Sequence, residues 1–130
     1  MFKRFRDNYI TSTNGRIYIA FSKETVGIDA EFLARRVDFT SIVKKFSDAE
    51  RSEILSSEDF LRHWTVKESA VKFLGGTLAH DLKKLGFYQN RLTYENAIFP
   101  TTVTLLQHEG YILSVCGSER FKNAEFIQLP

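Results

Sequence analysis

Three side chains of different chemistry recur at helical spacing within residues 64–72. At 3.6 residues per turn, Trp64, Glu68 and Lys72 fall on one stripe of a predicted helix, so an aromatic ring, a carboxylate and an ammonium project side by side. Apolar residues near this stripe place Glu68 at the margin of a core: Phe60, Leu61, Val71 and Leu74. The stripe indicates a chemically active helix face, although a simple surface ion pair between Glu68 and Lys72 has the same spacing.

A second stretch, residues 26–31, alternates apolar and polar side chains with the period of a half-buried strand. This period places Asp29 and Glu31 on one face, where two carboxylates repel each other unless a cation offsets the repulsion. A third carboxylate, from Glu68 on the helix, would complete an oxygen site of the kind that Mg²⁺ prefers. We therefore expect Asp29, Glu31 and Glu68 to be metal ligands.

The two stretches together resemble the signature of the 4'-phosphopantetheinyl transferases, in particular the Sfp type. That family has a Gly-hydrophobic-Asp-hydrophobic-Glu strand, which is similar to Gly27-Ile28-Asp29-Ala30-Glu31. Its helix reads Trp-Ser/Thr-x-Lys-Glu-Ser/Ala-x-x-Lys, which is similar to Trp64-Thr65-x-Lys67-Glu68-Ser69-x-x-Lys72. Every motif position is filled, on a chain as short as the AcpS-type members.

The resemblance implies a reaction and a role for each motif residue. The family moves the 4'-phosphopantetheine arm of coenzyme A to a serine of an acyl or peptidyl carrier protein, in a Mg²⁺-dependent step that releases adenosine 3',5'-bisphosphate. Lys72 would contact the phosphate, and Glu68 or Glu31 would accept the serine proton. Lys67 lies about 100° around the helix from Glu68, so we expect a secondary phosphate contact from it at best.

Two further segments are expected to bind the substrates. Residues 8–15 lie where the family binds the 3'-phosphate end of coenzyme A, and Thr11 and Ser12 keep its hydroxyl character, although Ser12 replaces the family's histidine. A polar lead-in to a strand is the alternative interpretation. Basic residues after Glu31 are expected to attract an acidic carrier protein, unless they form a solvated face: Arg35, Arg36, Lys44 and Lys45.

Composition favours one domain, residues 1–130, in the cytoplasm. The net charge of +2 gives no argument for nucleic acid, and no apolar run is long enough to span a membrane. Cys116 is the single cysteine, and His63, His80 and His108 lack the spacing of metal ligands.

We expect an α+β fold in which an antiparallel sheet packs against the long motif helix. Predicted hairpins join residues 17–22 to 27–31, and 102–107 to 111–116, and strands are expected at residues 85–89 and 92–95. Residues 39–46 have the pattern of an amphipathic docking helix. Ser47 with Glu50 predicts a capping box, Ser56 or Ser57 an N-cap, and Gly75 with Gly76 a helix end.

The resemblance also implies an incomplete site. Sfp-type members contain two similar halves with coenzyme A between them, and this chain corresponds to one half of that pseudo-dimer. We therefore expect a homo-oligomer, with a dimer favoured over the trimer of AcpS-type members. A degenerate relative that binds a carrier protein without catalysis, or an α+β interaction module with solvated carboxylates, are the alternatives.

Overall fold

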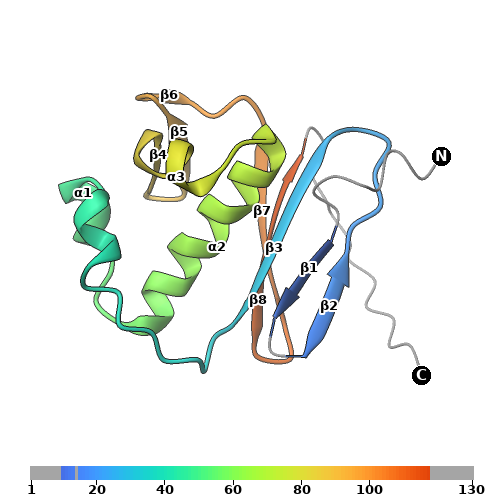
Figure 1. Cartoon of the computed structure of the whole chain (residues 1–130), viewed down its shortest axis with the longest axis horizontal. Coiled ribbons are helices and arrows are strands. Elements are labelled where there is room, and N and C mark those ends of the chain that lie inside the picture. Colours follow the sequence, from blue (N-terminus) through green and yellow to red (C-terminus); the bar gives the residue numbers. More distant parts are fainter. Residues whose placement is uncertain (1–9, 14, 118–130) are drawn as a thin grey trace.

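The computed structural model describes residues 10–13 and 15–117, with the side chains described from residue 15 onward. The helices lie together in the chain between two groups of strands, which is an α+β arrangement, as predicted (Figure 1). The elements are β1 (Ile10–Thr13), β2 (Arg16–Ile19), β3 (Val26–Phe32), the 3₁₀ turn η2 (Ile42–Lys45), α1 (Asp48–Arg51), α2 (Ser57–Leu74), α3 (Leu78–Asp81), the 3₁₀ turn η3 (Leu82–Lys84), β4 (Leu85–Tyr88), β5 (Arg91–Tyr94), β6 (Ala97–Ile98), β7 (Thr102–His108) and β8 (Tyr111–Gly117).

The central sheet is antiparallel, with the strand order β3-β8-β7. β7 and β8 form the predicted hairpin, and its turn places Glu109 and Gly110 at φ 48° and 82°, a left-handed pair that matches the twist of the strands. β3 pairs along its whole length with β8, so that Asp29 is opposite Ser114. The position of the motif strand β3 is therefore set by β8, the last strand of the described residues.

The predicted hairpin between residues 17–22 and 27–31 is wrong. In the described residues β2 pairs with β1, and β3 takes β8 as its partner. All of Val26–Ala30 is buried, and a strand buried on both faces gains more from the long, apolar β8 than from the short β2. Nearness in sequence suggested the first pairing, and long-range burial decided the second.

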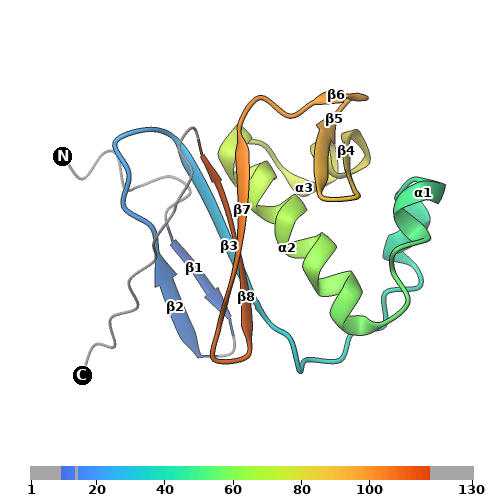
Figure 2. The same cartoon turned by 180° about the vertical axis from the view of Figure 1, so that it is seen from behind.

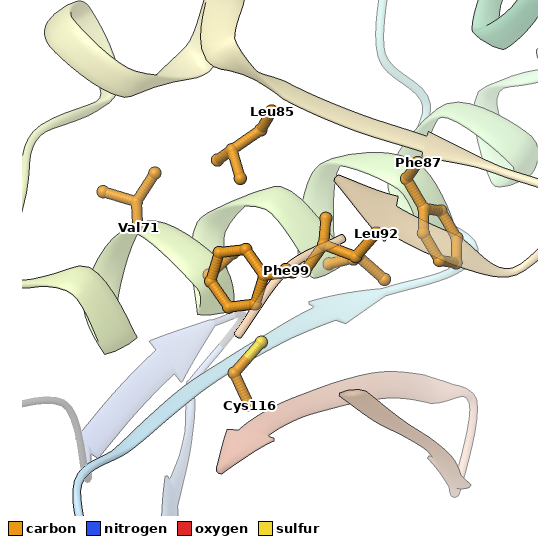
Figure 3. Packing of buried hydrophobic residues seen from close by; sticks show 8 residues of the cluster. Val71, Leu85, Phe87, Leu92, Phe99 and Cys116 are labelled. Atoms are coloured by element: carbon orange, nitrogen blue, oxygen red, sulfur yellow. The ribbon is translucent and has the colours of Figure 1, made fainter. Parts of the chain in front are cut away.

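The sheet lies between α2 and the β1–β2 hairpin, as the two opposite views show (Figures 1 and 2). On the hairpin side, Tyr18 packs in a cluster with Val26, Ile28 and Ala30 of β3. On the helix side, residues of α2 and of the small β4-β5-β6 sheet enclose a second cluster that reaches Cys116 (Figure 3). Alternate residues of β3 thus serve two layers, and the odd-numbered ones face α2.

Gly27 allows α2 to lie directly on β3. A Cβ atom at this position would stand 2.1 Å from the Ser69 carbonyl oxygen and 2.5 Å from the Phe73 nitrogen, which are helix backbone atoms. No side chain fits there without moving the helix. The motif glycine therefore sets the distance between the strand and the helix.

The helix boundaries follow the predicted signals closely. Ser56 is the N-cap of α2, with its hydroxyl accepting from the Asp59 amide at 3.1 Å, and Gly75 ends the helix at φ 69°. Ser47 caps α1 by accepting from the Glu50 amide at 3.2 Å, but the Glu50 side chain turns into the core instead of back to the helix start. Only half of the predicted capping box is formed.

One local prediction is wrong, and two short elements were not predicted. The expected docking helix over residues 39–46 is a short 3₁₀ turn, Ile42–Lys45, whose apolar neighbours pack inward around Phe46 and Phe60. The α3 helix and β6 were not predicted, because each is too short to show periodicity. No helix of the described residues is long and apolar enough to cross a membrane.

Candidate active site

The centre of the candidate site is Asp29 on β3. Its side chain lies on the face of the strand that is turned toward α2, and only 7% of the residue is exposed. Glu31, two residues further along the same face, is more accessible, with 15% of its side chain exposed. The alternation of the strand thus places two carboxylates beside the helix, as the sequence predicts.

Lys72 of α2 reaches across to this strand. Its ammonium donates to the Ile28 carbonyl at 3.0 Å and lies 3.3 Å from Asp29 Oδ1. One cation therefore binds both a main-chain and a side-chain oxygen of β3. Because 29% of the Lys72 side chain remains exposed, a ligand from solvent can reach it.

The pKa values show how closely the charges are grouped. The pKa of Asp29 is raised to about 7, chiefly by burial; Lys72 acts to lower it, and the charges of Glu68 and Glu31 add to the rise. Burial also raises the pKa of the half-buried Glu68, with Lys72 opposing and Glu31 reinforcing the shift. Asp29 and Glu68 therefore share Lys72 as a cation, and the charge of Glu31 acts on both of them.

The carboxylates are not preassembled around a metal position. Within residues 10–13 and 15–117, no group of three or more His, Cys, Asp or Glu side chains is arranged to hold a metal ion. Glu31 accepts a hydrogen bond from Arg35 at 2.8 Å, and Asp29 faces Lys72. The donor chemistry still fits Mg²⁺, because the oxygens are hard and a divalent cation would offset both the burial of the Asp29 charge and the repulsion from Glu68 and Glu31.

Comparison with known protein families places this geometry in context. The family model described as the 4'-phosphopantetheinyl transferase superfamily matches residues 25–116, which is more than half of the chain. The chain belongs to this superfamily. The match begins just before β3 and ends within β8, so it contains Asp29, Glu31, Glu68 and Lys72. A search among curated protein sequences finds no match.

The transferase motif residue Trp64 packs against an aromatic cluster. Its ring stacks on Phe60 with the ring centroids 5.5 Å apart, and Phe60 in turn stacks on Phe39 and Phe46. Trp64 is half-buried. Trp64, Glu68 and Lys72 therefore all lie on α2, but the ring of Trp64 packs on Phe60, which makes the ring contacts with the segment before α1.

Lys67 departs from its expected role in the candidate site. It is fully buried, its ammonium lies 2.8 Å from Glu50 Oε1, and it donates to the Leu85 carbonyl at 3.1 Å. A lysine inside the core, bound by acceptors of α1 and β4, is not available to a phosphate beside Lys72. This corrects the expectation of a secondary phosphate contact.

Thr11 and Ser12 lie in β1 rather than in a loop. They pair with Tyr18 and Ile17 of β2, and their side chains are outside the described part of the structure, as are residues 8, 9 and 14 of the predicted coenzyme A segment. The strand agrees with the alternative of a polar lead-in. Binding of coenzyme A by Thr11 and Ser12 stays a prediction.

Several contacts around the site were missed by sequence reasoning. The Ile28 carbonyl, an acceptor for Lys72, has no sequence signal. Ser69 binds Ser114 Oγ at 2.7 Å and Cys116 Sγ at 3.2 Å, which explains a small polar residue where α2 crosses β8. The contact between Glu31 and Arg35 could have been found from their spacing of four residues.

Proposed function

We propose that the protein transfers the 4'-phosphopantetheine arm of coenzyme A to a serine of an acyl or peptidyl carrier protein, with Mg²⁺, and releases adenosine 3',5'-bisphosphate. The observation that carries this proposal is the electrostatic grouping of Asp29 and Glu68 with Lys72, to which Glu31 adds its charge, within the segment that matches the superfamily. Phosphoryl transfer needs charge neutralisation and alignment, and such a group of charges supplies both.

In the proposed step, the serine oxygen forms a bond to the phosphorus that carries pantetheine, and the bond from that phosphorus to the bridging oxygen breaks. The bridging oxygen leaves with the adenosine 3',5'-bisphosphate and keeps the electron pair. Lys72 stabilises the negative charge that develops on the phosphates, because its ammonium is partly exposed beside Asp29.

We assign the base for the serine proton to Glu68, with Glu31 as the alternative. Burial raises the pKa of Glu68, which makes its carboxylate a stronger base, whereas Glu31 is bound to Arg35. Asp29, Glu31 and Glu68 would hold Mg²⁺, which supplies positive charge to the pyrophosphate oxygens when bound. Thr11 and Ser12 are proposed to contact the 3'-phosphate end of coenzyme A.

The chain would act as one half of a two-half transferase fold. A homodimer, or a homotrimer as the alternative, would supply the other wall of the coenzyme A site. We place the reaction in the cytoplasm, since the chain has a single cysteine and that thiol is buried.

A mass-shift assay tests the function. Apo acyl and peptidyl carrier proteins are incubated with the protein, coenzyme A and Mg²⁺, and the expected result is a carrier heavier by one phosphopantetheine arm. Glu68→Gln is the matched control, because it keeps the size of the side chain and removes the proposed base. A wild-type protein that leaves every carrier unmodified at saturating Mg²⁺ contradicts the proposal.

A non-catalytic relative that binds a carrier protein is the second candidate. Lys72 and Arg35 already compensate Asp29 and Glu31, and no preassembled metal group is present among the described side chains. Binding of an apo carrier protein in a titration, without any change of its mass, would favour this candidate.

A further inference from the structure

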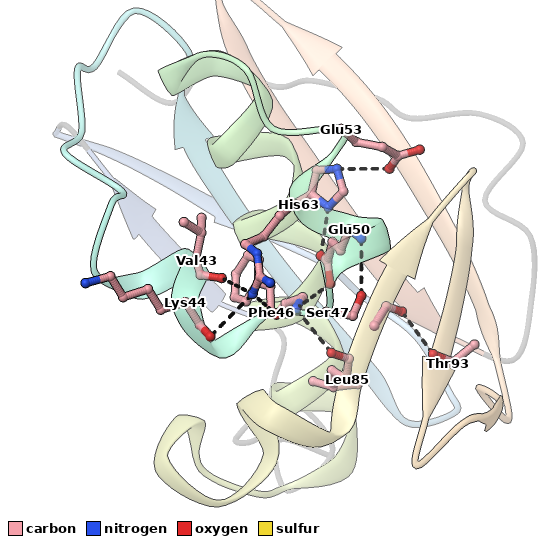
Figure 4. A network of polar contacts seen from close by, with 12 residues as sticks. Val43, Lys44, Phe46, Ser47, Glu50, Glu53, His63, Leu85 and Thr93 are labelled. Carbon is pink, nitrogen blue, oxygen red and sulfur yellow. Dashed lines mark hydrogen bonds and ion pairs between the residues drawn. The ribbon is translucent and has the colours of Figure 1, made fainter.

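A second group of charges lies inside the protein, on the side of α2 away from Asp29. Lys67 and Glu50 are both fully buried and form an ion pair at 2.8 Å. The other oxygen of Glu50 binds His63 Nδ1 at 2.8 Å, and His63 Nε2 lies 3.2 Å from Glu53 (Figure 4). One carboxylate of α1 therefore holds two successive turns of α2.

The surroundings of the Lys67 ammonium come from three separate segments. The Leu85 carbonyl at the start of β4 accepts from it at 3.1 Å, and the Phe46 ring centroid lies 3.4 Å away, before α1. Burial lowers the pKa of Lys67, and the charge of Glu50 acts to raise it again. The ammonium is thus held in one place by acceptors that belong to the fixed frame around the helix.

Such a network is a poor way to gain stability. A buried ion pair loses hydration that its mutual attraction only partly restores, and apolar side chains of similar volume are often as stable or more so. What the network offers instead is direction, because an apolar contact tolerates rotation and a charged hydrogen bond does not. The network should therefore fix the orientation of α2 more than it strengthens the packing of α2 on the rest of the protein.

The neighbouring residue in the chain is Glu68, the proposed base. A rotation of α2 about its axis would move Glu68 and Lys72 relative to Asp29, and Lys72 could no longer reach both the Ile28 carbonyl and Asp29. Gly27 fixes how near the helix lies to β3, but a glycine surface does not prevent rotation. The opposite side of the helix, where Lys67 is held, supplies that restraint.

We infer that Lys67 is a positioning residue: its ion pair with Glu50 and its bond to the Leu85 carbonyl set the rotation of α2, and thereby the placement of Glu68 and Lys72 against Asp29. The catalytic consequence rests on the proposed transferase function. The structural consequence, a fixed helix rotation, does not.

The test uses the double variant Glu50→Gln/Lys67→Met, which leaves no lone buried charge and keeps an amide oxygen for His63. Lys83→Met is the control, since Lys83 is exposed. Amide spectra in ¹⁵N NMR are compared at Gly27, Ile28 and Asp29, which lie across α2 from the substitutions. Transferase rates and melting temperatures are measured in the same samples.

The expected result is that the amides of Gly27, Ile28 and Asp29 shift in the folded double variant and stay in place in Lys83→Met. We expect kcat to fall roughly ten- to hundredfold, with the KM for coenzyme A changed less than about threefold. Unmoved amides in the folded double variant overturn the inference. An unchanged kcat in that folded variant also overturns it.

Failure of the proposed function, and failure of the double variant to fold, can each be distinguished from failure of the inference. A wild-type protein without transferase activity refutes the proposed function, and the amide comparison then decides the helix rotation alone. If the double variant does not fold, Glu50→Gln takes its place, since Gln keeps the shape of Glu50 and leaves His63 a partner. The amides of Gly27, Ile28 and Asp29 are then expected to shift in Glu50→Gln relative to the wild type, and unmoved amides again overturn the inference.

Discussion

Substitution of Asp29 by asparagine should stabilise the protein without ligands near neutral pH. The folded-state pKa of Asp29 is about 7, against 3.8 for the unfolded chain. At a pH between these values the native carboxyl holds a proton that the unfolded one has released. The contribution of the Asp29 carboxyl to the free energy of unfolding is thus fully present below about pH 4, and it is lost as the pH rises through 7.

The magnitude follows from the size of the shift. One pKa unit corresponds to 1.36 kcal/mol, so the rise from 3.8 to about 7 costs the native state about 4 kcal/mol once Asp29 is ionised. Raising the pH from 5 to 7 covers two pH units of this range, and it should lower the free energy of unfolding of the wild type by about 3 kcal/mol. The advantage of Asp29→Asn over the wild type should grow by about this amount.

Urea denaturation at half-unit steps from pH 5 to pH 8 measures the effect, in buffer without divalent metals. The control is Asp48→Asn, because 93% of the Asp48 side chain is exposed. Parallel curves for the wild type and Asp29→Asn across this range would refute the argument. Saturating Mg²⁺ at pH 8 should then favour the wild type, by about 2.7 kcal/mol at a hundred times the Kd, if Asp29 binds the metal.

Three other predictions concern the proposed base, the docking of the carrier protein and the contact between α2 and β3. Glu68→Gln should lower the transferase rate at least a hundredfold with little change in melting temperature, and a near-native rate at saturating Mg²⁺ would exclude Glu68 as base. Arg36→Glu should raise the KM for the carrier protein severalfold in low salt and spare that for coenzyme A; equal effects on both would argue against docking. Gly27→Ala should destabilise the fold by about 3 kcal/mol in urea, because its Cβ meets the Ser69 carbonyl at 2.1 Å, and an unchanged midpoint would contradict this contact.

Arg36 is the better docking probe of the two adjacent arginines. Arg35 binds Glu31 at 2.8 Å, so its reversal would also place a new carboxylate beside a proposed metal ligand. Arg36 is exposed, and no contact of this kind complicates its substitution in the described structure.

The sequence by itself determined the local features of this protein. Ser56 and Gly75 define α2 through their own side-chain and backbone chemistry, and the alternation of residues 26–31 puts Asp29 and Glu31 on one face of a strand. These signals depend on neighbours within a few residues. The two motifs, read together, also led to the superfamily that the family comparison shows.

Only the tertiary structure decided which partner each of these elements meets. The pairing of β3 with β8, the turn of Glu50 into the core and the burial of Lys67 depend on residues far away in the chain. The pKa of Asp29 is set in the same way, by burial under α2 and by charges on that helix. Desolvation and packing are properties of the assembled core, so a periodic pattern predicts that Lys67 lies on a helix but not that its face is the buried one.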